Sequence, residues 1–327
     1  MTVPQPNVAY RDAEHWPPLP YAEWRETSAT LHLWTQIVGK IRGARTPWLN
    51  HSWHVPFYLT TRGLTTSPIP CGERCFEIDF DFITHRLLIH RDDGELRSLP
   101  LEPRPVADFY REFMAQLNSL GLETTIHPVP NEVLEAIPFA EDTVHAAYDA
   151  AAAHRFWRVL VQADRVLKQF RSEFIGKCSP VHFFWGSFDL AVTRFSGRRA
   201  PPHPGGVPNC PDWVTRDAYS HEVSSCGFWP GNDAMPFPLF YAYAYPQPPG
   251  YSTTRLRPDA ASYDNALGEF ILPYDAVRQA ASPVSTLLDF LHDSYGAAAS
   301  LGDWDRTTLE RASDAILPVP RSQLPRR

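Results

Sequence analysis

The segment CFEIDFDF, residues 75–82, alternates large apolar and acidic side chains without interruption. Because the side chains of a β-strand point to opposite faces in turn, its apolar residues share one face and its carboxylates the other. One buried face and one solvated face are typical of an antiparallel sheet. The following run, RLLIHRDDGELRSLPL, carries Asp93-Gly94 between two apolar stretches, the turn sequence of a β-hairpin. The chain is therefore predicted to build antiparallel sheet from neighbouring segments.

Apolar residues three and four positions apart predict four helices. Pro105 begins the second of them and Gly121 ends it, which are ordinary helix boundaries. The predicted helices cover 21–44, 105–121, 154–174 and 283–302, and further strands are predicted over 53–61, 182–194, 221–229, 239–245 and 268–273. This mixture predicts an α+β fold.

The order of helix, strands and helix occurs twice, and local echoes accompany it. Trp53 and Arg62 are nine residues apart, as are Trp185 and Arg194. We therefore expect two similar halves, each a helix, an antiparallel β-meander and a helix, packed around a shared core or cleft. The expected segments are a proline-rich lead-in at 1–20, halves at 21–127 and 151–302, a connection at 128–150 and a tail at 303–327.

Composition excludes several classes of function. The 327 residues are 43% hydrophobic and carry a formal net charge of -7, so the chain can bury a core but lacks the basic surface of a nucleic-acid-binding protein. No segment approaches the ~20 apolar residues of a membrane span, and the first residues lack a signal-peptide pattern. We expect a cytoplasmic monomer or homodimer with no nucleic-acid or membrane partner. The five cysteines, an odd number, do not indicate a disulfide framework or a zinc site.

The run SPVHFFWGSFDLAVTRFSGRRAPPHPGGVP, which begins at Ser179, is the first candidate for a site. Its strand pattern places Trp185, Ser187 and Asp189 on one face, while His182 and Arg194 share the other face with apolar residues. An aromatic, hydroxyl and carboxylate mixture suits a wall that contacts a ligand. The same face is also compatible with a solvated surface on which Asp189 pairs with a neighbouring strand.

The loop that follows is rich in groups that bind anions. Arg198 and Arg199 precede His203 and the pair Gly205-Gly206, and guanidinium groups beside exposed backbone N–H groups can hold a carboxylate or phosphate. No phosphate-binding fingerprint is present, so an ordinary surface loop remains the alternative.

Histidines supply the candidate acid/base groups. His54 follows Trp53, and His221 precedes Glu222 in YSHEVSS. Together with His182 and His203 these are the groups to test for a metal, but their spacing matches no metal motif, and we predict neither a metal nor a cofactor. Acid/base or hydrogen-bonding roles are favoured. The ladder Tyr241, Tyr243, Tyr245 places three phenol rings on one sheet face, where they either pack against a helix or line an aromatic cleft.

Four blocks of the sequence resemble a family of bacterial proteins of similar length that is known only as a domain of unknown function. They are LPYAEWRETSATLHLWTQIVGKIR, NHSWHVPFYLTTRGLTTSPIP, the run from Ser179 quoted above, and AYSHEVSSCGFWPG. The resemblance covers most of the chain. It implies a cytosolic bacterial protein whose two aromatic-histidine segments belong to the family pattern, and it implies no activity.

The sequence favours an enzyme that acts on a small anionic or aromatic metabolite in a cleft between the halves. His54, His182, His221, Glu222 and Asp189 are the candidate catalytic residues, and Trp53, Arg62, Trp185, Arg194, Arg198, Arg199 and His203 are the candidate ligand-binding residues. A non-catalytic small-molecule-binding protein and a protein-interaction module with aromatic anchors are the alternatives.

Overall fold

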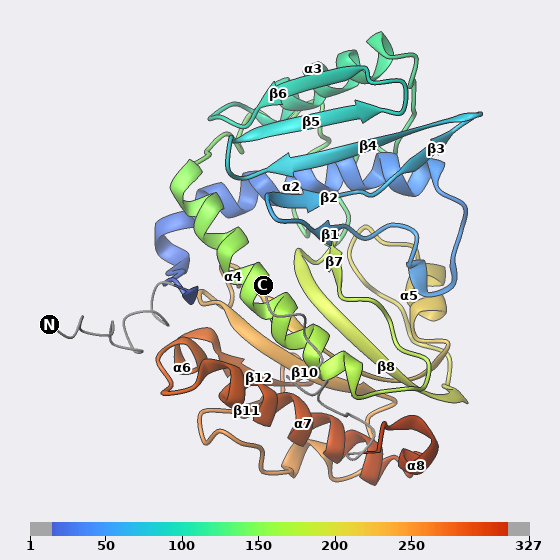
Figure 1. Cartoon of the computed structure of the whole chain (residues 1–327), viewed down its shortest axis with the longest axis vertical. Helices are drawn as coiled ribbons and strands as arrows, with labels where there is room; N and C mark the ends of the chain where they lie inside the picture. Colours follow the sequence, from blue (N-terminus) through green and yellow to red (C-terminus); the bar gives the residue numbers. More distant parts are fainter. Residues whose placement is uncertain (1–14, 313–327) are drawn as a thin grey trace, which may run out of the picture.

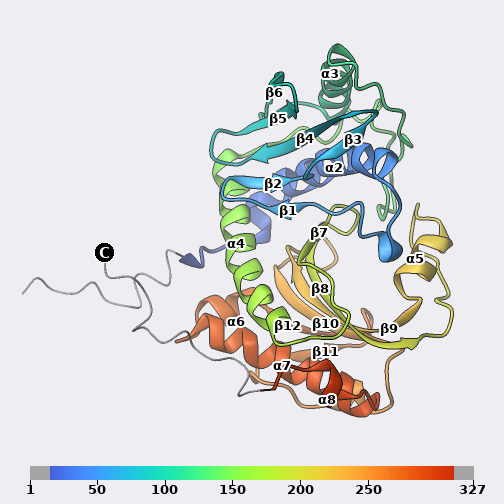
Figure 2. The same ribbon diagram turned by 45° about the vertical axis from the view of Figure 1, so that its right-hand side comes forward.

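The computed structural model describes residues 15–312 and has an α+β fold. Two antiparallel sheets of six strands each lie one above the other in Figure 1, with helices between and around them. Long helix α4 runs diagonally across one side of both sheets, and short helix α5 lies on the opposite side (Figure 2). No helix in the described range 15–312 is long and apolar enough to cross a membrane.

The first sheet follows the chain closely. Its strands are β1 (Tyr58–Leu59), β2 (Gly63–Thr65), β3 (Ile69–Cys71), β4 (Arg74–Asp81), β5 (Arg86–Arg91) and β6 (Leu96–Pro100). Their order is β1-β2-β4-β5-β6, and β3 pairs with β4 beside β2. The alternation predicted for β4 is confirmed, because Phe76, Ile78 and Phe80 are buried while Glu77 and Asp79 are only half-buried.

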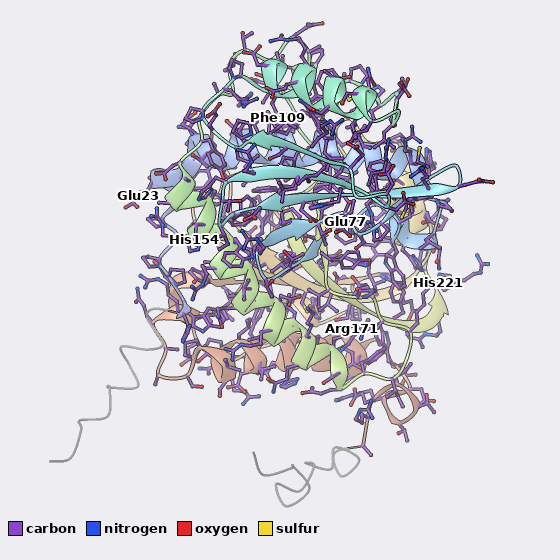
Figure 3. The ribbon with its side chains drawn as sticks, turned by 45° about the horizontal axis from the view of Figure 1, so that its top comes forward. Glu23, Glu77, Phe109, His154, Arg171 and His221 are labelled. Carbon is purple, nitrogen blue, oxygen red and sulfur yellow. The ribbon has the colours of Figure 1, made fainter. Side chains whose placement is uncertain are left out.

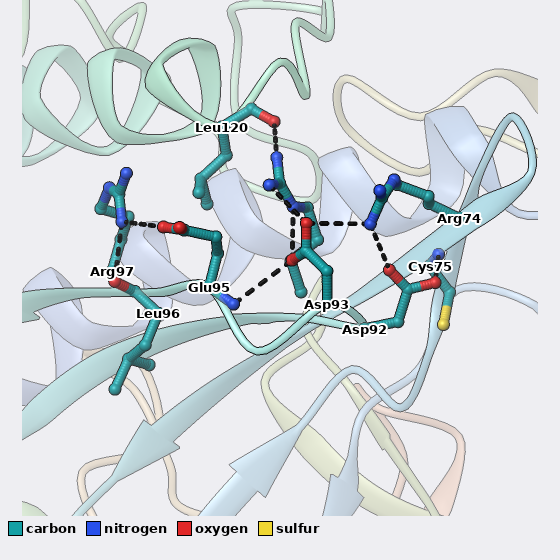
Figure 4. A network of polar contacts seen from close by, with 9 residues as sticks. Arg74, Cys75, Asp92, Asp93, Glu95, Leu96, Arg97 and Leu120 are labelled. Carbon is teal, nitrogen blue, oxygen red and sulfur yellow. Dashed lines mark hydrogen bonds and ion pairs between the residues drawn. The ribbon is translucent and has the colours of Figure 1, made fainter.

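The predicted β-hairpin between β5 and β6 is confirmed. Gly94 adopts a φ of 89° at the turn, a conformation that costs glycine little because it has no Cβ. Figure 4 shows the charged groups around this turn, where Arg74 contacts the carboxylates of Asp92 and Asp93. Arg91 forms an ion pair with Asp93 and donates to the Leu120 carbonyl, which ties the turn to the end of helix α3.

Two helices pack with the first sheet, close to the predicted limits. They are α2 (Tyr21–Arg45) and α3 (Val106–Ser119). Their inner faces meet through aromatic rings: Trp34 of α2 stacks on Phe109 of α3 with ring centres 4.6 Å apart. Figure 3 shows Phe109 between α3 and the first sheet. The connection at 128–149 contains no helix or strand, as its lack of periodicity predicts.

The second sheet has the order β11-β12-β10-β9-β8-β7. Its strands are β7 (His182–Phe184), β8 (Asp189–Arg199), β9 (His221–Trp229), β10 (Leu239–Tyr245), β11 (Ser262–Asp264) and β12 (Glu269–Pro273). The helices of this half are α4 (Ala150–Ser172), α5 (Asp212–Ala218), α6 (Tyr274–Arg278), α7 (Pro283–Leu301) and α8 (Arg306–Leu309). Helices α4 and α7 contact β8, β9 and β10, so they cover one face of the sheet and leave the other for the site.

Two predicted strands are wrong. Residues 53–61 form mostly irregular chain after the short 3-10 helix η1 (Asn50–Ser52), and only Tyr58 and Leu59 are paired. The predicted strand 182–194 is a hairpin, because residues 185–188 turn the chain and bring β7 against β8. The sequence did not reveal this turn, because three of its residues are Trp185, Ser187 and Phe188 and Gly186 is its only glycine.

The structure does not confirm the internal duplication. Trp53 lies in irregular chain before β1, whereas Trp185 lies in the β7–β8 turn. Arg62 lies between β1 and β2, whereas Arg194 lies within β8. The last strand of the first sheet, β6, is an edge strand, whereas β12 lies between β10 and β11. The residues that match between the two halves of the sequence therefore occupy different positions in the fold.

Candidate functional site

A cavity of about 420 Å³ lies on the face of the second sheet that α4 and α7 leave uncovered. Strands β8, β9 and β10 form its floor, and residues 51–55, 131–132 and 203–219 form its walls. Aromatic rings dominate the lining and include Trp53, Phe184, Trp185, Phe195, Tyr241 and Tyr243. Size and composition are those of a small-molecule site. The first half and the connection contribute only short segments, so the cavity belongs mainly to the second sheet.

Strand register explains the floor. Thr193 of β8 pairs with Ser225 of β9, and Ser225 pairs with Tyr243 of β10, so these three side chains form one polar row. The Thr193 and Ser225 hydroxyls are 2.9 Å apart. The adjacent row contains Ala191, Gly227 and Tyr241. Tyr241 and Tyr243 therefore line the cavity, as one of the two interpretations of the ladder expects, whereas Tyr245 is not part of the lining and donates to the Pro201 carbonyl.

Gly227 permits the main polar contact of the floor. A Cβ atom at this position would overlap the Leu190 carbonyl and the Tyr241 ring and hydroxyl. Without it, the Tyr241 side chain crosses β9, and its hydroxyl donates a hydrogen bond to Asp189 Oδ2. Tyr219 from the wall adds a second phenol contact, with its hydroxyl 2.9 Å from that of Tyr243.

Asp189 is a buried carboxyl at one end of the floor. Its side chain lines the cavity although only 6% of the residue is exposed. Burial raises its pKa to about 6, against the opposing effect of the Tyr241 and Ser187 hydroxyls. Its second oxygen, Oδ1, is buried and accepts no hydrogen bond of ordinary geometry within residues 15–312, although the Ser187 hydroxyl lies close enough to lower the pKa of the carboxyl. A buried acceptor without a donor is costly, so this atom is available to a donor on a ligand.

Glu132 supplies a second carboxyl from the connection. It is exposed to the cavity, yet the protein around the cavity still raises its pKa to about 7, and the charge of Asp189 adds to the increase. The Ser187 hydroxyl lowers the pKa of both carboxyls, which places it beside the pair. A Cβ at Gly186 would overlap the Glu132 carboxylate, so the turn between β7 and β8 fits closely against it.

Hydrogen bonds hold Glu132 in place. The residue has a backbone φ of 60°, which is unusual for a residue other than glycine. Its backbone N–H donates to the Pro208 carbonyl at 2.8 Å. The Gln36 amide accepts from the Asn131 N–H at 2.7 Å and donates to the Asn131 carbonyl at 2.8 Å. Sequence reasoning missed Glu132, because nothing in PVPNEVLEA distinguishes it from a linker residue.

A third carboxyl lies next to the floor. Glu269 of β12 comes directly after the Ala242–Phe270 pair, so it lies level with Tyr243 of β10 and one strand beyond the lining. Burial raises its pKa to about 7, and the charge of Asp189 contributes to the increase. Asp189 and Glu132 therefore give this end of the cavity a negative potential, and Glu269 adds to it from the level of Thr193; no arginine or lysine of the described lining offsets it.

His54 and His203 lie at the cavity, but each ring already has a structural contact. His54 Nδ1 accepts from the Leu49 N–H at 3.2 Å, and His203 Nδ1 accepts from the Gly205 N–H at 3.1 Å. His203 also stacks on Tyr219. Trp53 and Trp185 line the cavity as well, and the Trp185 indole N–H donates to the Val55 carbonyl at 2.9 Å.

The other two candidate histidines do not line the cavity. His182 is fully buried, and Nε2 lies 3.3 Å from the Tyr58 hydroxyl. Burial and nearby arginines lower its pKa to about 3, so the ring stays neutral in ordinary buffers. His221 is half-buried at the start of β9, where Figure 3 labels it, and its ring centre is 5.9 Å from that of His51.

The arginines expected at a cleft lie elsewhere. Arg62 pairs with Asp81 at 2.7 Å in the first sheet. Arg194 points to the opposite face of β8, as its place in the alternation predicts, and is 2% exposed among the rings of α4 and α7. Arg198 pairs with Glu222 at 2.7 Å, and this pair is also outside the lining. Arg199 is exposed at the end of β8, paired in register with His221.

Two groups at this end of the cavity, His51 of the lining and Lys177 beside it, were not among the candidate site residues. His51 is buried, and its Nδ1 lies 3.1 Å and 3.2 Å from the carbonyls of Asp217 and Ala218. Because a carbonyl only accepts, Nδ1 carries the proton and Nε2 is free to accept. The Lys177 ammonium donates to that Nε2 at 2.5 Å.

In the described part of the chain, no three histidine, cysteine, aspartate or glutamate side chains come together as metal ligands would. The groups to test for a metal do not form a common site, because each has the separate position given above: His54, His182, His203, His221 and Glu222. The carboxyl pair and the aromatic walls are the chemical features of the site.

Comparison with known proteins places the chain in a family. No curated protein and no solved structure matches it significantly. One family model matches residues 16–311, which includes every residue of the cavity. The chain belongs to the DUF5996 family, which is described as a family of unknown function.

Proposed function

We propose that the cavity binds a small molecule with an aromatic body and a protonated amine, and that Asp189 and Glu132 hold the amine. The observation that supports this proposal is the carboxyl pair within an aromatic enclosure, with Asp189 Oδ1 lacking a donor among the described residues. An ammonium group supplies both the missing N–H donor and the opposite charge. The faces of Trp and Tyr rings attract cations further.

This proposal departs from the anionic metabolite expected from the sequence. That expectation relied on arginines as clamps, and the arginines named for it lie outside the cavity lining. An anionic group placed at the end where Asp189, Glu132 and Glu269 gather meets like charge. A cation is favoured there by each carboxyl that ionises.

An acid/base enzyme is the second candidate, and one observation favours it. Asp189 and Glu132 have pKa values raised to about 6 and about 7, near the pH at which proton transfer is most effective. These carboxyls then replace the histidines as the groups that move a proton. An interaction module receives less support, because Trp53, Trp185, Tyr241 and Tyr243 line the cavity.

Binding of three matched probes tests the proposal. The probes are p-phenylbenzylamine, the uncharged p-phenylbenzyl alcohol, and biphenyl carboxylate, each titrated by calorimetry at pH 8. We expect the amine to bind at least tenfold more tightly than the alcohol, because a charge-assisted hydrogen bond in a dry site contributes about 1.5–3 kcal/mol. The Asp189→Asn variant should lose this preference, and Asp259→Asn, an exposed carboxylate paired with Arg255, is the matched control.

Equal affinity for the amine and the alcohol would refute the amine site. Mass spectrometry of the same mixtures after long incubation separates the two candidates. Conversion of the amine probe that requires Asp189 supports the enzyme, and recovery of unchanged probe supports the binding protein.

A further inference from the structure

We infer that an anion subsite, formed by Lys177 with Arg199 and His221, lies just beyond the end of the cavity opposite Asp189, so that the ligand carries an anionic group remote from its amine. This inference rests on the proposed function for the amine end. It assigns the ligand to a class: a rod-shaped molecule with an aromatic body, an aliphatic amine at one end and a carboxylate or phosphate at the other.

Lys177 points to the cavity face of the sheet. Residue Cys178 forms a β-bridge with Arg194, and the Phe195 N–H donates to the Lys177 carbonyl at 3.0 Å. Lys177 therefore lies opposite Phe195 and on the same face. Its ammonium is 4.8 Å from the centre of the Phe195 ring and 5.4 Å from that of Trp53, and both rings line the cavity.

No acid neutralises the charge of Lys177. Its ammonium donates to His51 Nε2, and the tautomer fixed by the carbonyls of Asp217 and Ala218 makes that imidazole neutral. Within residues 15–312, no carboxylate lies within ion-pair distance of Lys177. The nearest acid by its electrostatic effect, Asp217, uses Oδ2 to accept the His51 N–H at 2.6 Å.

Two further donors lie on the same face beyond Phe195. Val223 and Ser225 of β9 line the cavity, so His221, two residues before Val223, points to the same side. Arg199 pairs with His221 in the ladder, and its exposed guanidinium has no hydrogen-bond or ion-pair partner in the described part of the chain. The His51 ring lies between the cavity and His221. Lysine, arginine and histidine thus face one region, in which Asp217 is the acid whose charge acts on Lys177 and His221 without pairing with either.

The spacing of the two ends limits the ligand. Asp189 and Phe195 are six residues apart on β8, a distance of about 20 Å along the strand. Because both side chains stand on the same face of the strand, this distance is an upper limit, and the amine and the anion of a ligand that occupies both ends are on the order of 10–20 Å apart. An α-amino acid, whose two charges share one carbon, cannot reach both ends.

A pair of probes that differ only at the far end tests the inference. The first is p-phenylbenzylamine, and the second is the same molecule with a carboxylate at the far para position. We expect the second probe to bind at least about tenfold more tightly to the native protein, because an ammonium–carboxylate contact adds a charge-assisted hydrogen bond. In Lys177→Met, the two probes should bind equally. Lys168→Met, which removes an exposed lysine of α4, is the matched control and should keep the difference.

The outcomes separate the inference from the proposed function. If the amine probe binds and the carboxylate adds no affinity, the anion subsite is wrong and the amine site stands. If the carboxylate adds affinity that persists in Lys177→Met or is unchanged in Arg199→Met, the anion does not bind at this subsite and the inference is again wrong. If neither probe binds, the proposed function fails and the inference fails with it. Lys177 and Arg199 are both exposed, so these variants are expected to fold.

Discussion

The Tyr241 hydroxyl donates a hydrogen bond to Asp189 Oδ2 across the intervening strand β9. A donor of this kind stabilises the ionised carboxyl and lowers its pKa. Burial has the larger effect, and the pKa of Asp189 rises to about 6. The folded protein therefore holds a carboxyl that is poorly solvated at neutral pH, with one oxygen occupied and the other available to a ligand.

The first prediction concerns stability against pH. The raised pKa of Asp189 means that the folded state binds a proton more readily than the unfolded state, whose carboxyl titrates near 3.8. Asp189 therefore destabilises the fold fully above pH 6, and this penalty disappears as the pH falls from about 6 towards 4. We expect Asp189→Asn to be more stable than the native protein at pH 8, by up to about 3 kcal/mol, and the two to converge near pH 4.

Urea unfolding at a series of pH values between 4 and 8 measures this difference. The Asp259→Asn variant changes an exposed carboxylate and should show no such trend. A constant difference between Asp189→Asn and the native protein would contradict the burial of an ionisable Asp189.

The second prediction concerns Gly227. An alanine there places a Cβ against the Leu190 carbonyl and the Tyr241 hydroxyl, neither of which can move without breaking the ladder or the bond to Asp189. We expect Gly227→Ala to lower the free energy of unfolding by about 1–3 kcal/mol, as overpacking does. Gly296→Ala in α7 meets no atom within 4 Å and should be neutral or stabilising by up to about 1 kcal/mol. Equal melting temperatures for the two variants would show that β9 does not need a glycine there.

Regular elements could be predicted from the sequence because they depend on local pattern. The alternation in β4 and the hairpin turn at Asp93-Gly94 both appear in the structure, and α2 and α3 begin or end within a residue or two of the expected positions. Strand order and pairing could not be predicted, since β12 joins β10 through contacts that no period reveals. The same limit explains why the expected duplication is not confirmed, because that expectation rested on residue spacing and not on strand pairing.

Part of the site could be predicted from one strand. The alternation of β8 placed Asp189 with Ala191 and Thr193 on a shared face, and these three residues line the cavity. Glu132 and Lys177 could not be predicted, because each reaches the site from irregular chain through long-range contacts. Arg194 shows the converse error: it was expected to reach the cleft, although its own alternation with Thr193 directs it into the core.

The third prediction distinguishes Arg194 from a ligand-binding residue. Its guanidinium lies 3.4 Å from the centre of the Phe170 ring and 4.3 Å from that of Tyr295, and it donates to the Phe170 carbonyl. Arg194→Met removes one of the two donors to that carbonyl, which keeps the Glu173 N–H, and removes the cation–π contacts, so we expect a loss of about 1–3 kcal/mol of stability. Binding of p-phenylbenzylamine should not change.

Chemical denaturation and calorimetry on the same Arg194→Met preparation check both parts. Arg165→Met, on the exposed side of α4, should alter stability by less than about 0.5 kcal/mol. A weaker affinity for the probe without a loss of stability would show that Arg194 takes part in ligand binding.

The fourth prediction concerns the pH dependence of amine binding. Asp189 and Glu132, with pKa values of about 6 and about 7, lose their charge as the pH falls from 8 to 5, whereas an alkylamine with a pKa of about 10 stays protonated. Each carboxyl that must be ionised for binding weakens the affinity by up to about tenfold per pH unit below its pKa. We therefore expect p-phenylbenzylamine to bind at least tenfold more weakly at pH 5 than at pH 8, and the alcohol analogue to show no such change. Calorimetric titrations of both probes across this range give the slope, and Glu132→Gln should remove the part of it that begins near pH 7. Amine affinity that is constant from pH 8 to pH 5 would mean that neither carboxyl contacts the ammonium.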